Sequence, residues 1–181
     1  MLIKEKYITL KDGRQALLRT PTADDASAMI EYLEKISCET DFLLRSSEDS
    51  LPSLADEQRF LEAQICSKTK CMIACFVDGN HVGNCSISFN TKRKLMHRAS
   101  IGIAVVKEFW GLGIGTAMFG EMERIAREYG ASQLELEFVE NNIRARALYE
   151  KCGFRIVGIH PDAFICEDGS MVNEYLMIKK I

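Results

Sequence analysis

The stretch that decides the fold is residues 100–129, SIGIAVVKEFWGLGIGTAMFGEMERIAREY. It begins with an apolar segment over residues 101–106, passes through a glycine-rich turn, and ends in a segment whose apolar residues recur at three- and four-residue steps. That spacing predicts an amphipathic helix, and Gly130 stands where a glycine commonly ends one. We therefore expect a strand, a glycine turn and a long helix in succession.

The glycine turn, residues 110–116 (WGLGIGT), is predicted to bind an anion. The first backbone N–H groups of a helix have no partner within the helix, and the aligned peptide dipoles favour negative charge there. Glycine also lets a phosphate approach the main chain, because no Cβ stands in the way. The sequence thus indicates a ligand that carries phosphate.

Three phosphate ligands compete for this turn. A nucleoside triphosphate loop requires Gly-Lys-Ser or Gly-Lys-Thr, whereas Gly115 is followed by Thr116 and Ala117. A dinucleotide-binding turn has its last glycine at a different spacing, and too little chain follows Gly115 for the remaining parallel units of that fold. The third ligand is the pyrophosphate of coenzyme A, which the sequence downstream favours.

The rest of the chain shows alternating signals for strands and helices. Asp-Gly turns predict two hairpins, one of them within residues 1–20. Helical spacing covers about residues 22–37, 54–67 and 141–151, and strands are predicted over residues 3–10, 15–20, 71–77, 81–90, 99–106, 133–139, 154–160 and 171–179. This order predicts a single α/β (α+β mixed) domain over residues 1–181, with a mixed sheet and helices on both faces.

Composition narrows the class of protein. The net charge is −3, no apolar run is long enough to cross a bilayer, and the N-terminus lacks the apolar core of a signal peptide. We therefore expect a cytoplasmic protein that binds neither nucleic acid nor a membrane. Seven cysteines without a Cys-x-x-Cys pair predict reduced, buried thiols and no metal site.

Residues 141–154 read NNIRARALYEKCGF. Together with the glycine turn, they closely resemble the GCN5-related N-acetyltransferase (GNAT) superfamily. The resemblance covers about residues 71–181, the cofactor-binding core, and includes both signature motifs; the N-terminal helices fit more loosely. In that family the turn begins with Arg or Gln, and Trp110 stands at this position here.

The resemblance implies a mostly antiparallel, twisted sheet of about seven strands, splayed apart between the strands at residues 101–106 and 134–138. The pantetheine arm of acetyl-CoA would lie in this gap and bond to the backbone as an added strand does. A main-chain N–H near Val105 would polarise the thioester carbonyl. The cofactor-binding residues implied are Ile103, Ala104, Val105, Trp110, Gly111, Leu112, Gly113, Ile114, Gly115, Thr116, Asn142, Ala145 and Tyr149.

The activity implied is transfer of an acetyl group from acetyl-CoA to a primary amine of a small molecule or peptide, by direct attack in a ternary complex. The alternative is a non-catalytic module that binds acyl-CoA as a sensor. The loops at residues 39–52 and 160–170 are expected to select the acceptor. Dimers are frequent in similar proteins, so a homodimer is also considered.

Acetyl transfer to an amine requires a neutral amine, a stabilised oxyanion and a proton for the departing thiolate. Tyr149 matches the family tyrosine that protonates the sulfur, and a phenol with a reference pKa of about 10 stays protonated at neutral pH. The alternative is a tyrosine packed in the core. Asn142 either contacts the cofactor or caps the following helix.

The general base has no obvious candidate, because Ser100 stands where many relatives carry a glutamate. Glu137 is the candidate on the facing strand, where it points the same way as Glu135. If that face is buried, a carboxylate there has a raised pKa suited to a base; the alternative is an exposed strand face. Glu39 and Asp41, expected in the loop after the first helix, are candidates for binding the amine.

Overall fold

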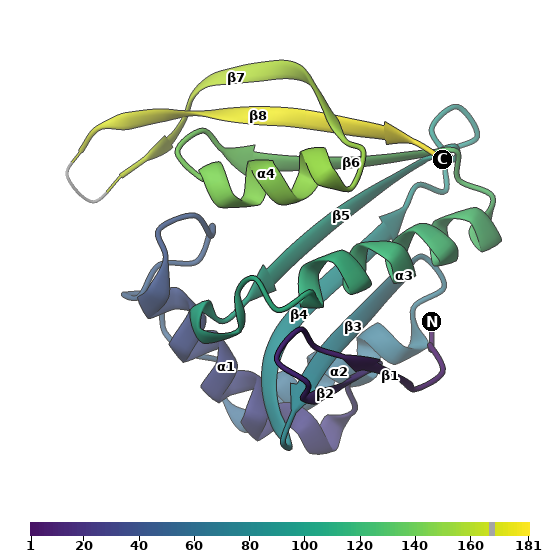
Figure 1. Cartoon of the computed structure of the whole chain (residues 1–181), viewed down its shortest axis with the longest axis vertical. Helices are drawn as coiled ribbons and strands as arrows, with labels where there is room; N and C mark the ends of the chain where they lie inside the picture. Colours follow the sequence, from purple (N-terminus) through teal and green to yellow (C-terminus); the bar gives the residue numbers. More distant parts are fainter. Residues whose placement is uncertain (167–168) are drawn as a thin grey trace.

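The computed structural model describes residues 1–166 and 169–181 (Figure 1). Within them, eight strands form one sheet in the order β1-β2-β3-β4-β5-β6-β8-β7. The strands are β1 (Lys6–Thr9), β2 (Gln15–Arg19), β3 (Lys70–Val77), β4 (Asn80–Phe89), β5 (Arg98–Val105), β6 (Gln133–Val139), β7 (Arg155–Ile165) and β8 (Met171–Lys180). Every segment predicted as a strand forms one, so the sheet has eight strands rather than about seven.

Helices connect these strands. They are η1 (Ala23–Asp25), α1 (Ala26–Glu39), α2 (Leu54–Cys66), η2 (Lys107–Phe109), α3 (Ile114–Tyr129) and α4 (Ile143–Lys151). In Figure 1, α3 and α4 lie in front of the sheet, and α2 lies behind it. The predicted α/β architecture with helices on both faces is confirmed. None of the helices in the described ranges is long and apolar enough to span a membrane.

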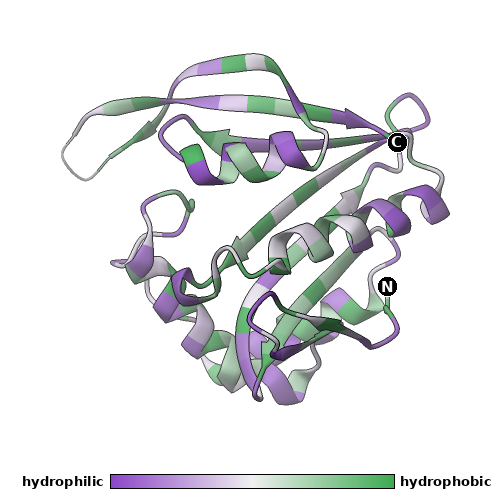
Figure 2. Ribbon diagram, viewed as in Figure 1, coloured by the Kyte–Doolittle hydropathy of each residue, from purple (hydrophilic) through white to green (hydrophobic). Residues whose placement is uncertain are grey.

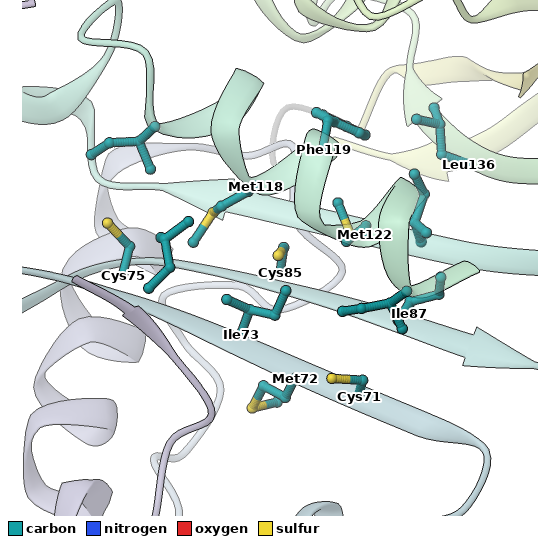
Figure 3. Close-up of a cluster of buried hydrophobic side chains, with 14 of the residues drawn as sticks. Cys71, Met72, Ile73, Cys75, Cys85, Ile87, Met118, Phe119, Met122 and Leu136 are labelled. Carbon is teal, nitrogen blue, oxygen red and sulfur yellow. The ribbon is translucent and has the colours of Figure 1, made fainter. Parts of the chain in front are cut away.

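The helix α3 packs its apolar stripe on the sheet as its spacing predicts. Met118 and Met122 are fully buried, and Figure 3 shows them above Ile73 and Cys85 of the neighbouring strands. In Figure 2, hydrophobic residues follow β3 and β5, whereas hydrophilic residues gather near the C-terminal end of α3. This packing fixes the position of the N-terminus of α3, where the glycine turn lies.

The cysteines are free thiols, and only some of them are buried as predicted. Cys71, Cys75 and Cys85 lie in the core, whereas Cys38 and Cys66 are exposed. Burial raises the pKa of Cys75 to about 12, so this thiol stays protonated at neutral pH. The core cysteines therefore serve as small apolar side chains rather than as nucleophiles.

The sheet splits where the resemblance implies. The parallel strands β5 and β6 pair only from Arg98 opposite Gln133 to Ser100 opposite Glu135, and the two ribbons then diverge (Figure 1). Beyond this point β5 stays paired with β4, and β6 stays paired with β8. Two strand edges without a partner strand thus face each other across a gap.

The hairpin of β7 and β8 is longer than predicted. The expected loop at residues 160–170 is mostly strand, because β7 continues to Ile165; residues 167–168 lie outside the described part of the chain. A register shift between His160 and Phe164, with Asp162 at a φ of 51°, accommodates the irregular stretch. Pro161 is tolerated because β7 is an edge strand, whose outer N–H groups need no ladder partner.

Candidate functional site

A cavity of about 680 Å³ lies in the gap between β5 and β6. Its wall includes β5 and β6, the glycine turn, the inner side of α4 and the loop after α1, with Phe164 of β7 and Glu174 of β8 at its rim. It therefore connects the predicted anion site to the predicted acceptor loops.

The glycine turn has the backbone of an anion site. Gly111 and Gly113 have φ values of 82° and 103°, in the left-handed region that favours glycine, and Gly113 is the N-cap of α3. Among the described residues, no hydrogen-bond acceptor is found for the N–H groups of residues 111–116. These free donors, at the positive end of the α3 dipole, confirm the expected local structure.

The third glycine of the turn brings two helices together. A Cβ on Gly115 would lie 2.8 Å from Cδ2 of Leu148, so the side chain of Leu148 would have to shift. Ile114 is buried in the core, and Thr116 lies on the cavity wall. Gly115 thus lets Leu148 of α4 pack closely against the start of α3.

Trp110 and Arg144 form a stack beside the turn. The indole N–H of Trp110 donates to the carbonyl of Val105 at 2.5 Å, and the guanidinium carbon of Arg144 lies 4.9 Å from the centre of the indole ring. A Cβ on Gly111 would lie 3.3 Å from Nη2 of Arg144. A cation is therefore next to the free N–H groups, although Trp110 replaces the charged or polar residue of the family pattern.

The backbone polar groups of the cofactor-binding residues predicted on β5 point in two directions. The carbonyl of Ala104 points away from the gap, because it accepts a hydrogen bond from the hydroxyl of Tyr32 at 3.0 Å. The N–H of Val106 bonds to Val82 of β4, so by alternation the polar groups of Ile103 and Val105 point toward the gap. Ile103, Ala104 and Val105 all contribute to the cavity wall.

Tyr149 combines a buried ring with an unpaired hydroxyl. It is 7% exposed, and its ring makes edge contacts with Phe119 and Phe138, with ring centres 5.5 and 5.6 Å apart. Tyr149 lines the cavity, and no described residue bonds to its hydroxyl. Burial raises the pKa of Tyr149 to about 12, so the hydroxyl keeps its proton throughout the neutral range.

Asn142 caps α4. Its side-chain oxygen accepts from the N–H of Ala145 at 3.0 Å, which is the capping alternative in the sequence analysis. Asn142 and Ala145 also lie on the cavity wall. Capping fixes the first turn of α4 and with it the position of Arg144.

The two glutamates of β6 differ in burial and in their partners. Burial alone would raise the pKa of Glu135, but hydrogen bonds from Arg98 and Gln133 outweigh it, so the pKa lies below its usual value. Glu137 is exposed and lines the cavity. At Glu137 the alternative of an exposed strand face applies, and Glu137 is the member of the pair that lines the cavity.

Glu174 of β8 is a cavity residue that no sequence motif points to. It pairs with Val139 of β6, so its side chain is on the same face of the sheet as Glu137. Its side chain is 18% exposed and lines the cavity. Burial and the charge of Glu137 raise the pKa of Glu174, while His160, with Nδ1 at 3.9 Å, acts in the opposite direction. No short-range signal identifies this residue, because it depends on the register of β8 against β6.

Glu39 and Asp41 are not on the cavity wall. Glu39 is the last residue of α1 rather than part of the loop, and its carboxylate accepts from the N–H of Lys107 at 2.7 Å. This bond ties α1 to the segment after β5. Asp41 is exposed, and the loop residues that line the cavity are Thr40, Phe42, Leu43 and Leu44.

Comparisons with known proteins agree with this geometry. Residues 30–154 match the Acetyltransferase (GNAT) family. The chain is 28% identical over 111 residues to the L-amino acid N-acetyltransferase AaaT of Escherichia coli K12, an alignment that covers 61% of this chain and 67% of that protein.

Solved structures show the same fold. An acetyltransferase of the GNAT family from Streptococcus pneumoniae superposes with a TM-score of 0.84 at 28% identity, over 92% of this chain and 99% of that one. The protein yncA of Salmonella typhimurium, solved with its cofactor acetyl-CoA, superposes with a TM-score of 0.77 at 14% identity, over 91% of this chain and 93% of that one.

Proposed function

This chain belongs to the GNAT family of acetyltransferases, and on that basis we propose that it transfers the acetyl group of acetyl-CoA to a primary amine. It is an acetyltransferase, and acetyl-CoA is its cosubstrate. The observation that carries the proposal is the cavity, which connects the N–H groups of residues 111–116 with the hydroxyl of Tyr149, all of them without a partner in the described part of the chain.

The free N–H groups of the turn hold the pyrophosphate of acetyl-CoA, and Arg144 adds a positive charge beside them. The pantetheine arm bonds to the edge of β5 at Ile103 and Val105 as an added strand does. The N–H of Val105 is the donor for the thioester carbonyl, since the Val105 carbonyl is occupied by Trp110. This route leads the acetyl group toward Tyr149.

Transfer is direct. The amine attacks the thioester carbon, and Tyr149 donates its proton to the leaving sulfur. Among the described residues on the cavity wall there is no cysteine that could carry the acetyl group. Glu137 is the general base that the sequence predicts, and we assign it contact with the amine. We also propose that residues 1–181 work as one domain; the cytoplasmic location and the homodimer stay predictions.

The proposal is tested by measuring CoA release with a thiol reagent across a panel of amines. The panel includes L-amino acids, because AaaT is named for them, together with polyamines, aminoglycosides and peptide N-termini. We expect at least one amine to release CoA above the rate of acetyl-CoA hydrolysis. If acetyl-CoA binds in calorimetry and no amine reacts, the sensor alternative replaces the enzyme.

Arg144→Ala is expected to weaken acetyl-CoA binding about tenfold, because one hydrogen bond to a charged group contributes about 1.5–3 kcal/mol and 1.4 kcal/mol is a factor of ten. The loss should vanish for acetyl-pantetheine, which has no pyrophosphate. Calorimetry measures both dissociation constants.

Arg146→Ala is the matched control for this experiment. Arg146 is two residues along α4, and its guanidinium pairs with Glu150 on the same helix. We expect its loss to leave both dissociation constants unchanged. An equal loss for acetyl-CoA and acetyl-pantetheine in Arg144→Ala would assign Arg144 to the packing of Trp110 instead.

A further inference from the structure

The cations on the described part of the cavity wall are Lys11, Arg144 and Lys151, and the N–H of Lys11 bonds to Leu112 of the glycine turn. Arg144 lies beside the glycine turn, whereas the carboxylates on the described part of the wall are Glu137 and Glu174 on the strands opposite. Apolar side chains, including Phe42 and Phe164, also line the cavity; we call the part at Glu137 and Glu174 its acidic end and the part at the glycine turn its basic end. A cofactor that carries phosphates fits the basic end, which leaves the acidic end for the other substrate.

We propose that the acceptor is a cationic amine whose ammonium group binds between Glu137 and Glu174, and that Glu174 accepts the proton the amine loses before attack. The inference rests on the proposed function and adds to it the charge of the acceptor and the identity of the base. A second observation points to a ligand in this cavity: Tyr149, a side chain more than nine-tenths buried, lies on its wall, and its hydroxyl has no partner among the described residues.

The strand register brings the two carboxylates together. Glu137 is opposite Leu176, and Val139 is opposite Glu174, so Glu137 and Glu174 are diagonal neighbours on one face of an antiparallel pair. Such neighbours are about 7–8 Å apart, which leaves room for an ammonium nitrogen between the two carboxylates.

The two proposed proton transfers involve groups on opposite faces of the sheet. Phe138 contacts the ring of Tyr149, so Tyr149 is on the face of β6 opposite to Glu137 and Glu174. The gap in the sheet beyond Ser100 opens the cavity to both faces. The amine therefore approaches the thioester from one side, while the acid for the sulfur acts from the other.

Other nearby carboxylates already have partners. Glu135 is paired with Arg98, and Glu140 accepts from Tyr175 and Asn173. Glu174 faces only Glu137 from β6 and His160 from β7 among the charged groups that shift its pKa. Burial and the charge of Glu137 raise that pKa, and a carboxylate with a raised pKa accepts a proton more readily.

The proposed reaction accounts for every proton and every bond. The ammonium gives one proton to the carboxylate of Glu174, and the neutral amine forms the C–N bond at the thioester carbon. The tetrahedral intermediate breaks its C–S bond, and Tyr149 gives its proton to the sulfur. The nitrogen then loses a second proton, which restores Tyr149, and Glu174 releases the first proton to solvent. The products are the N-acetylamine, CoA and one proton.

The test compares Glu174→Gln and Glu137→Gln with Glu62→Gln, a control on the exposed side of α2. With the best amine of the panel, we expect Glu174→Gln to lower kcat/KM about 50-fold at pH 7. This deficit should shrink as the pH approaches the pKa of the amine, because free amine then no longer needs a base. Glu137→Gln should raise the KM of the amine, and Glu62→Gln should change nothing.

Two further measurements make the outcome decisive. Glu174→Asp should recover part of the rate, and the acetyl-CoA dissociation constant should be unchanged in all variants. Amides of L-amino acids should react faster than the free amino acids, whose carboxylate would be repelled.

Three results would each overturn the inference alone. They are a wild-type kcat/KM in Glu174→Gln, a deficit of Glu174→Gln that does not depend on pH, and a preference of the enzyme for the free amino acids. Acetyl-CoA binding without turnover of any amine by the wild type overturns the proposed function as well.

Discussion

Replacing Tyr149 with phenylalanine is expected to lower kcat about 1000-fold, within the range that general acids contribute. The acetyl-CoA dissociation constant should change less than about twofold, because the ring stays in place against Phe119 and Phe138. The unfolding free energy should be nearly unchanged, since no described residue bonds to the hydroxyl. Single-turnover kinetics and calorimetry separate these effects.

Tyr175→Phe is the control for that experiment. Tyr175 also packs against Phe138, but its hydroxyl donates to Glu140 and it is not part of the cavity wall. We expect its removal to leave kcat unchanged. Unaltered turnover in Tyr149→Phe would place Tyr149 among the core residues, the alternative in the sequence analysis.

The pH profile gives an independent check on the same residue. An acid acts in its protonated form, and burial raises the pKa of Tyr149 to about 12. Tyr149 therefore stays competent up to about pH 11, and a loss of activity near pH 9 must come from another group. If such a loss disappears in Tyr149→Phe, Tyr149 titrates in that range and the expectation fails.

Local sequence signals were sufficient for much of this architecture. The glycines at 111, 113 and 130 stand at positive φ, where the pattern predicts a turn and a helix end, and the spacing after the turn correctly predicts the buried face of α3. These features depend on residues within a few positions of one another. These features can therefore be predicted from the sequence without knowledge of the tertiary structure.

Features that depend on distant segments were not predictable in the same way. Arg144 meets Trp110 only because α4 returns to the start of α3, and Glu174 faces the cavity only because of the register between β8 and β6. The sequence predicts Glu39 in the loop, but α1 extends to Glu39, whose carboxylate accepts from the N–H of Lys107. Alternation correctly places Glu135 and Glu137 on one face, yet it does not show that Arg98 pairs with Glu135.

Gly113→Ala is expected to weaken acetyl-CoA binding more than 100-fold. Gly113 has a φ of 103°, and alanine disfavours this region by about 1–2 kcal/mol, so the backbone would rotate and turn its neighbouring N–H groups away from the pyrophosphate. Each lost bond to a charged phosphate costs about 1.5–3 kcal/mol, and two such bonds account for the expected change. Calorimetry with acetyl-CoA measures it.

Gly130→Ala separates backbone strain from ligand binding. Gly130 ends the same helix with a φ of 88°, and at both glycines an added Cβ meets no atom within 4 Å. The two variants should therefore lose similar unfolding free energy, about 1–2 kcal/mol, in denaturant titrations. Only Gly113→Ala should lose acetyl-CoA, because only the N-terminal end of α3 presents free N–H groups to the cavity. Equal affinity in the two variants would mean that the pyrophosphate binds elsewhere.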